Sequence, residues 1–290
     1  MIKKATLIHL RLPFSFFLMP FFLFGISQLD NVNVMQMVLA FVVIHVFHNG
    51  ASNAFNSYFD KDEGSIGGIE NPPPVDKELY VVSLLFDVIA IVLACFVNIT
   101  FASMVFAIGL ASKAYSHPMI RFKKYAVLGL VVVAFFQGAW TYLMAIVVET
   151  PHAVLIPQHL YAATICSLML LGSYPMTQIY QHDEDAKRGD RTFSLLLGIR
   201  GTFVWTMSIF TIATVLFVWY FIVYENLTTA ILFVMVMFPV VVFFLNWMYH
   251  AWSDTKKANY KSTMRLNLLS SLCFNLFFLG LFIYKIVIAN

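Results

Sequence analysis

Charged residues are scarce in this 290-residue chain, at 11% against roughly 25% in soluble domains. Together with a hydrophobic content of 60%, this scarcity excludes a soluble globular protein and favours an integral membrane protein. Cysteine is rare as well. All three cysteines, Cys95, Cys166 and Cys273, fall inside apolar runs, which is typical of packing residues and implies neither a disulfide framework nor a metal site.

Long apolar runs dominate what remains, and each is long enough to cross a bilayer. We predict nine of them, at residues 8–27, 34–58, 79–98, 100–116, 125–148, 158–180, 202–224, 228–248 and 266–288. Only Asn98 and its neighbours mark the boundary between the third and the fourth. The first run lacks a small-residue cleavage site, so we expect no cleavable signal peptide. The fold class is therefore an all-α polytopic membrane protein, with residues 1–290 forming one domain.

Positive charge is almost absent from one side of the membrane when the nine predicted spans are taken as crossings. Of the 18 lysines and arginines, all but Lys285 lie at the N-terminus or around the loops that follow the second, fourth, sixth and eighth runs. The positive-inside rule makes that side cytoplasmic. We expect an integral protein of the cell inner membrane with a cytoplasmic N-terminus and an extracytoplasmic C-terminus.

Two acidic segments stand at the cytoplasmic ends of the second and sixth runs. Each places an amide and a carboxylate four residues apart, which stacks them on one face of a helix: Asn56 with Asp60, and Gln181 with Asp185. Carboxylates at a membrane boundary are costly and therefore indicate a function. Polar stripes lead to both pairs along otherwise apolar helices. The alternative is ordinary hydrogen bonding between helices.

Gln181 follows Asn56 by 125 residues, and Asp185 follows Asp60 by the same number. This match suggests two related halves that face each other across a central cavity. Magnesium prefers oxygen ligands and is usually bound by one or two carboxylates together with substrate phosphates. We therefore predict a Mg²⁺ site for a diphosphate, with Asp60 and Asp185 as the main ligands and Asn56 and Gln181 as amide-oxygen partners. Four neighbouring acids are weaker candidates, or else a solvated loop face: Asp62, Glu63, Asp183 and Glu184.

A third polar element follows the fourth run and contains Tyr115, Arg121, Lys123 and Lys124. Cations beside an acidic metal cluster would stabilise charge on a departing diphosphate. Ordinary topology explains any one of these basic residues equally well, and for Lys124 we favour that explanation.

Taken together, these motifs resemble the UbiA-type intramembrane prenyltransferase family over nearly the whole chain. Three pieces carry the resemblance: Asn56-xxx-Asp60, Tyr115-Ser-His-Pro-xx-Arg121-Phe-Lys123, and Asp185-xxx-Gly-Asp-Arg191-Thr-xxxxx-Gly198. The resemblance implies a helical bundle with a central cavity open to the cytoplasmic side, Mg²⁺ dependence, and transfer of a prenyl group from an isoprenyl diphosphate to an acceptor.

By position, the resemblance assigns Asn56, Asp60 and Asp185 to the metal–diphosphate site. Tyr115, Arg121, Lys123 and Arg191 would contact the diphosphate, and Asp60, Asp185 and Lys123 are the predicted catalytic residues. The acceptor is not readable; a quinone precursor or another aromatic or lipid molecule fits. We expect the bilayer as surroundings and no nucleic-acid partner.

Two positions depart from the family pattern. The first motif commonly has a further acid where this chain has Gly64, and the second has Gln181 in place of its leading aspartate. An uncharged amide oxygen binds a metal more weakly, so the number of Mg²⁺ ions stays open; Asp62, Glu63 or Asp183 would compensate.

Three other functions are alternatives to prenyl transfer. A terpene cyclase of the same fold would use the same ionisation machinery. A transporter with repeated halves would need polar residues at the bilayer midplane and charge on both faces. A catalytically inactive lipid-binding relative is the third. Asp87, inside the third run, either orients an acceptor, takes a proton, or is a structural acid.

Overall fold

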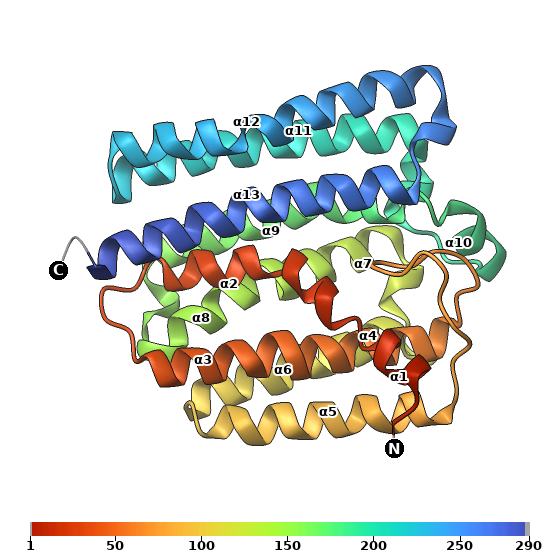
Figure 1. Cartoon of the computed structure of the whole chain (residues 1–290), viewed down its shortest axis with the longest axis horizontal. Helices are drawn as coiled ribbons and strands as arrows, with labels where there is room; N and C mark the ends of the chain where they lie inside the picture. Colours follow the sequence, from red (N-terminus) through yellow and green to blue (C-terminus); the bar gives the residue numbers. More distant parts are fainter. Residues whose placement is uncertain (1, 288–290) are drawn as a thin grey trace.

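The structure, a computed structural model, describes residues 2–287 and consists of helices packed side by side along one axis (Figure 1). The elements are α1 (Lys4–His9), η1 (Leu12–Phe17), α2 (Met19–Ile26), α3 (Val34–Val42), η2 (Val43–His48), α4 (Asn49–Asp60), α5 (Lys77–Cys95), α6 (Ile99–Ser116), η3 (Phe122–Lys124), α7 (Ala126–Val133), η4 (Ala134–Trp140), α8 (Thr141–Glu149), η5 (Ala153–Leu155), α9 (Pro157–Gln178), α10 (His182–Arg188), α11 (Phe193–Tyr224), α12 (Leu227–Ser253), η6 (Thr255–Lys257) and α13 (Tyr260–Val287). The predicted all-α class is confirmed.

Eight helices within residues 2–287 are long and apolar enough to cross a membrane. A pair of helical segments, Lys4–Phe17 and Met19–Ile26, passes the same test together but is bent by 47°, and it makes a ninth span if the pair counts as one. Eight of the nine predicted spans are therefore found as long helices, and the predicted first span is this bent pair, with a break where one continuous helix was expected. Two prolines cause much of this, because Pro13 and Pro20 each stand within the first two positions of a helical segment, where proline favours a new start over continuation. Arg11 adds a left-handed residue, with φ of 47°.

Several predicted boundaries shift by a few residues. The seventh span begins at Phe193 rather than residue 202, with a break at Gly198, whose φ is 67°. The ninth begins at Tyr260 rather than 266, and its predicted last residue, 288, lies outside the described residues. The boundary at Asn98 is confirmed: this residue caps α6 by accepting a hydrogen bond from the Phe101 amide at 2.8 Å.

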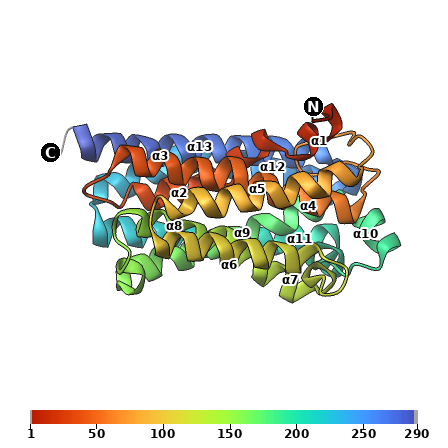
Figure 2. The same ribbon diagram turned by 90° about the horizontal axis from the view of Figure 1, so that it is seen from below.

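The polar connections gather at one end of the bundle. The end of α4, the loops that follow α4 and α6, and the short helix α10 lie together at the right of Figure 1, and Figure 2 shows the same grouping from below. The C-terminal end of α13 lies at the opposite end. One end of the molecule therefore carries both acidic segments and the basic loop.

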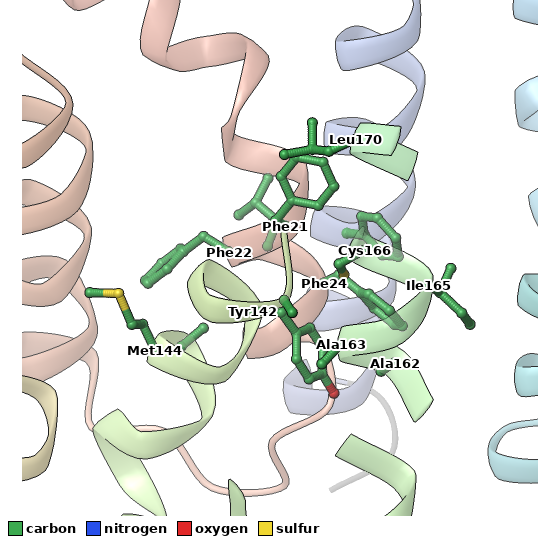
Figure 3. Close-up of a cluster of buried hydrophobic side chains, with 14 of the residues drawn as sticks. Phe21, Phe22, Phe24, Tyr142, Met144, Ala162, Ala163, Ile165, Cys166 and Leu170 are labelled. Carbon is green, nitrogen blue, oxygen red and sulfur yellow. The ribbon is translucent and has the colours of Figure 1, made fainter. Parts of the chain in front are cut away.

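A buried aromatic cluster fills the core toward the other end, where α2, α8 and α9 meet (Figure 3). Phe24 is fully buried and stacks on Phe278 of α13, with ring centroids 4.7 Å apart. The Tyr142 ring of α8 packs on its other side at 5.0 Å. These contacts bury large aromatic areas and tie the first span to two others.

Candidate functional site

A cavity of about 650 Å³ lies inside the bundle, between residues of α2, α4, α6, α9, α11, α12 and α13. Most of its wall is apolar and rich in phenylalanine. Its charged lining residues are confined to the end near α10, and they are Arg11, Asp60, Asp62, Lys123, Asp185, Arg188 and Asp190. An apolar chamber with ionic groups at one end suits an amphiphilic ligand with a charged head.

The acid of the first segment is paired with the basic loop. The Lys123 ammonium lies 2.5 Å from Asp60 Oδ1, and both side chains are almost fully buried. Arg121 makes a two-pronged contact with Asp190, at 2.9 Å from Nε and 2.8 Å from Nη2, and its Nη2 lies 3.6 Å from Asp60. The third predicted element therefore does meet the first one in space.

Arg188 of α10 joins the two acidic segments. It pairs with Asp62 and lies 3.4 Å from Asp185 Oδ1, and its Nη1 donates a hydrogen bond to the Asp60 carbonyl at 3.2 Å. The other Asp185 oxygen accepts a hydrogen bond from the Thr192 hydroxyl at 3.1 Å. Segments 125 residues apart thus converge on one guanidinium group.

The two segments are built differently, which corrects the predicted symmetry. Asn56 and Asp60 share one continuous helix, α4. Gln181 and Asp185 do not lie on the sixth span, because α9 ends at Gln178 and Gln181 precedes the separate helix α10. The Asp185 amide still donates to the Gln181 carbonyl at 2.9 Å, so the two residues remain one helical turn apart.

Pro175 explains part of the irregularity near the end of α9. Proline has no amide hydrogen, so the Leu171 carbonyl loses its partner within the helix. The Trp205 indole of α11 donates to that carbonyl instead, at 2.7 Å. This bond fixes α9 against α11 ten residues before the acidic segment begins at Gln181.

Both predicted amide ligands are anchored through their nitrogen atoms. Asn56 Nδ2 donates to the Ser116 hydroxyl at 3.0 Å, and Gln181 Nε2 donates to the Ser65 carbonyl at 3.2 Å. Within the described residues neither amide oxygen accepts a hydrogen bond, and both residues line the cavity. In each residue the amide oxygen, the atom that can coordinate a cation, is therefore not used in a hydrogen bond.

The charge state of the second segment depends on cations. Burial raises the pKa of Asp185 to about 6, although Arg188 and Lys123 oppose the shift. For Asp190, burial is outweighed by the hydrogen bond from Arg121 and by the charges of Lys123 and Arg121, so its pKa is lowered. Asp190 is therefore held as an anion beside Arg121, whereas Asp185 is protonated more easily, and a cation beside it would stabilise its ionised form.

The structure also places the remaining candidates. Tyr115 lines the cavity, where its hydroxyl is hydrogen-bonded to Tyr174. Arg191 is exposed and is not part of the cavity lining; its backbone amide donates to the Lys124 carbonyl at 3.2 Å. Lys124 is exposed, in agreement with the topological interpretation.

The four neighbouring acids divide into two kinds. Asp62 lines the cavity and pairs with Arg188, while Glu63 and Asp183 are exposed and do not line it. Glu184 turns toward the first segment, where it accepts a hydrogen bond from the Gly64 amide at 2.6 Å. Of the three acids proposed to compensate for the departures, only Asp62 is therefore placed to do so.

Two residues that form ion pairs with the predicted site residues were not selected from the sequence: Arg188, which pairs with Asp62 and Asp185, and Asp190, which pairs with Arg121. Arg188 follows Asp185 by three residues, a spacing that places both on one helical face, so this contact was readable. Its pairing with Asp62 was not, because nothing local connects residues 126 positions apart. Asp87, by contrast, forms an ion pair with Lys113 at 2.5 Å and is not part of the cavity lining, which favours the structural interpretation of that acid.

The donor set fits magnesium bound together with a phosphate group. Among the described residues no three acidic, histidine or cysteine side chains converge into a complete metal cage. Magnesium seldom uses such cages; it takes one or two carboxylates, water, and substrate phosphate oxygens. Carboxylates of Asp60 and Asp185 and free amide oxygens of Asn56 and Gln181, all at one end of one cavity, supply that kind of partial set.

Comparisons with known proteins agree with this geometry. A model described as the UbiA prenyltransferase family matches residues 16–272. A structure of a UbiA homolog from Archaeoglobus fulgidus bound to GPP and Mg²⁺ is 18% identical, with a TM-score of 0.69 over 96% of this chain and 99% of that one. An apo UbiA homolog from Aeropyrum pernix K1 is 17% identical, with a TM-score of 0.71 over 92% and 97%.

A digeranylgeranylglyceryl phosphate synthase structure is 16% identical, with a TM-score of 0.62 over 98% of both chains. At these identities the structures share the fold. A search of curated proteins found no match.

Proposed function

Because the chain belongs to the UbiA prenyltransferase family, we propose that it transfers a prenyl group from an isoprenyl diphosphate to an acceptor in a Mg²⁺-dependent reaction. The family match confirms the enzyme class predicted from the sequence, a prenyltransferase, and the apolar helices make the chain an integral membrane protein. The magnesium dependence, the acceptor and the site residues belong to the proposal.

One observation carries it: a single apolar cavity whose ionic groups are confined to one end. An isoprenyl diphosphate divides in the same way, into a hydrocarbon chain and a multiply charged head. The Archaeoglobus fulgidus homologs were solved with GPP and with DMAPP, each together with Mg²⁺, which supports the same division for this fold.

The basic residues would hold the diphosphate and stabilise it as it leaves. Lys123 and Arg188 line the charged end, and Arg121 is held beside it by Asp190. Guanidinium and ammonium groups lower the energy of charge developing on the bridging oxygen. Mg²⁺, held by Asp60, Asp185 and the oxygens of Asn56 and Gln181, would neutralise the diphosphate and weaken its bond to the prenyl carbon.

The aromatic wall would protect the reacting carbon. Ionisation of an allylic diphosphate leaves a cation that water destroys, and phenylalanine faces stabilise positive charge without attacking it. Tyr115 and Tyr174 lie where the charged end meets the apolar wall. Capture of the cation by the acceptor, followed by loss of a proton from the acceptor, completes the transfer.

The orientation in the membrane follows the charge pattern and is part of the proposal. The loops at the ionic end hold the basic residues that the positive-inside rule places in the cytoplasm. A cytoplasmic ionic end would admit water-soluble Mg²⁺ and release diphosphate on the same side. We assign the protein to the cell inner membrane on this ground.

The test is a purified-protein assay in detergent with Mg²⁺, radiolabelled isoprenyl diphosphates and a panel of quinone precursors and other aromatic or lipid acceptors. We expect prenylated product that disappears on chelation with EDTA. Failure of every isoprenyl diphosphate to bind or react would reject the proposal. A cyclic hydrocarbon formed without any acceptor would instead identify a terpene cyclase.

A further inference from the structure

The lining of the cavity beyond its ionic end differs from helix to helix; it is apolar along α12, where Val241 and Leu245 are also exposed, and mixed along α11 and α13. Along α11 and α13 the lining includes the polar residues Thr211, Thr214, Asn267, Ser270 and Ser271. Along α2 and α9, beyond the tyrosine pair, it is apolar, with Phe21, Phe24, Cys166 and Leu170. A hydrocarbon chain packs more favourably along α2 and α9, because there it covers apolar side chains and removes no hydroxyl or amide group from water.

The apolar wall ends in a closed floor. Phe24 stacks on Phe278 at 4.7 Å and lies 5.4 Å from the Phe217 ring, and all three are at most 2% exposed although they line the cavity. Phe24 and Cys166 belong to the buried cluster drawn in Figure 3. The three rings come from α2, α11 and α13, so the floor is held by separate helices.

A second layer supports this floor from behind. Tyr142, Tyr220 and Phe221 are fully buried against Phe24. The Tyr220 hydroxyl donates to Gln28 Oε1 at 2.7 Å and accepts from Gln158 Nε2 at 3.1 Å. Close packing together with a satisfied hydrogen-bond chain resists opening of the floor.

The depth of the chamber follows from α9, which runs along it. Gln178, near the ionic end, and Cys166, at the floor, are twelve residues apart on this helix, which corresponds to about 18 Å. An isoprene unit adds four chain carbons, or roughly 5 Å when extended. Three to four units would therefore fill the distance.

We propose that Phe24, together with Phe217 and Phe278, forms a chain-length stop that limits the isoprenyl diphosphate to about four isoprene units. This inference rests on the proposed function and specifies its substrate. Leu170 lies one helical turn closer to the ionic end than Cys166, so a larger side chain there would shorten the chamber by about one unit.

The experiment measures Mg²⁺-dependent binding and needs no acceptor. Unlabelled isoprenyl diphosphates of two, three, four, six and eight units compete with radiolabelled geranyl diphosphate for the purified full-length protein. For the wild type we expect affinity to fall at least tenfold between four and six units. Phe24→Ala should move that fall to a longer chain, and Leu170→Trp should move it to a shorter one.

Phe22→Ala is the matched control. Phe22 is also a buried phenylalanine of α2, but it points away from Cys166 in Figure 3 and does not line the cavity. It should leave the length profile unchanged. Equal affinity for all lengths in the wild type would overturn the stop and indicate a chain that leaves sideways between helices, as would an unchanged profile in both cavity variants. Absence of any Mg²⁺-dependent binding would instead reject the proposed function.

Discussion

Lys123 and Asp60 form a buried ion pair at the ionic end of the cavity, with the ammonium nitrogen 2.5 Å from Oδ1. The two residues come from the loop after α6 and from the end of α4, so the pair joins the basic and acidic motifs. In the absence of ligand it keeps a buried carboxylate neutralised. With the proposed diphosphate and Mg²⁺ bound, each partner would have a new counter-charge, and the pair could separate without leaving either charge uncompensated.

Replacement of Lys123 by methionine should damage both stability and activity. It leaves Asp60 buried beside only the more distant Arg121, and breaking a buried pair typically costs about 3–5 kcal/mol. We expect a lower thermal midpoint in detergent and at least a hundredfold loss of kcat/KM. Lys124→Met is the control, because Lys124 is the adjacent but exposed lysine. A Lys123→Met protein that kept wild-type turnover would show that this cation does not serve the diphosphate.

Asp185→Asn should abolish the magnesium dependence of diphosphate binding. The substitution keeps the size of the side chain and removes the charge that an entering cation requires. Titration of bound geranyl diphosphate against Mg²⁺ should show at least a hundredfold loss of affinity at saturating Mg²⁺, with little change in its absence. Asp183→Asn, on the same helix but exposed, should behave as the wild type. Equal losses in the two variants would point to a general effect on α10.

The sequence predicted the composition of the site better than its geometry. The apolar runs and the distribution of lysine and arginine located the spans. Asn98 was correctly interpreted as a boundary, because a capping side chain acts on residues close to it in the sequence. The break after Gln178 was missed because the pattern of Ser173, Thr177, Gln181 and Asp185 continues with helical spacing through it. Hydrophobic periodicity describes which face a residue would occupy, not whether the backbone remains helical.

Contacts between residues far apart in the sequence were the second feature of the site that could not be predicted. Glu184 was assigned with its neighbours to a solvated face or a metal, yet it reaches across 120 residues to the Gly64 amide. Asp190 was not selected at all, although it holds Arg121 by two hydrogen bonds. Both contacts follow from how the loops fold over the ionic end, which no spacing within either motif encodes.

Gln181→Asp should strengthen magnesium binding. The variant replaces an uncharged oxygen with a carboxylate at a position that lines the cavity, and it adds one negative charge beside Asp185. It also removes the hydrogen bond that Gln181 donates to the Ser65 carbonyl, so part of the gain will be lost. We expect the Mg²⁺ concentration for half-maximal diphosphate binding to fall severalfold. Gln181→Ala removes the same hydrogen bond without adding charge, and it should shift the concentration upward.

Gly64→Asp should impair this protein even though it restores the acid common in the family. A Cβ built on Gly64 would lie 2.9 Å from Glu184 Oε1, so the new side chain would meet an existing carboxylate. Two neighbouring carboxylates repel each other, and the hydrogen bond from the Gly64 amide to Glu184 would be strained. We expect roughly tenfold lower kcat/KM and a reduced thermal midpoint.

The double variant Gly64→Asp/Glu184→Ala tests whether the Glu184 carboxylate causes the loss of activity expected for Gly64→Asp. If Glu184 occupies the space that the missing acid would need, then removing it should recover most of the activity lost in Gly64→Asp, and the two substitutions should be non-additive. Adding Asp183→Ala instead should give no recovery, because that acid is exposed and the atoms nearest a Cβ at Gly64 all belong to Glu184. Additive losses would mean that the backbone at residue 64, rather than the Glu184 carboxylate, excludes a side chain there.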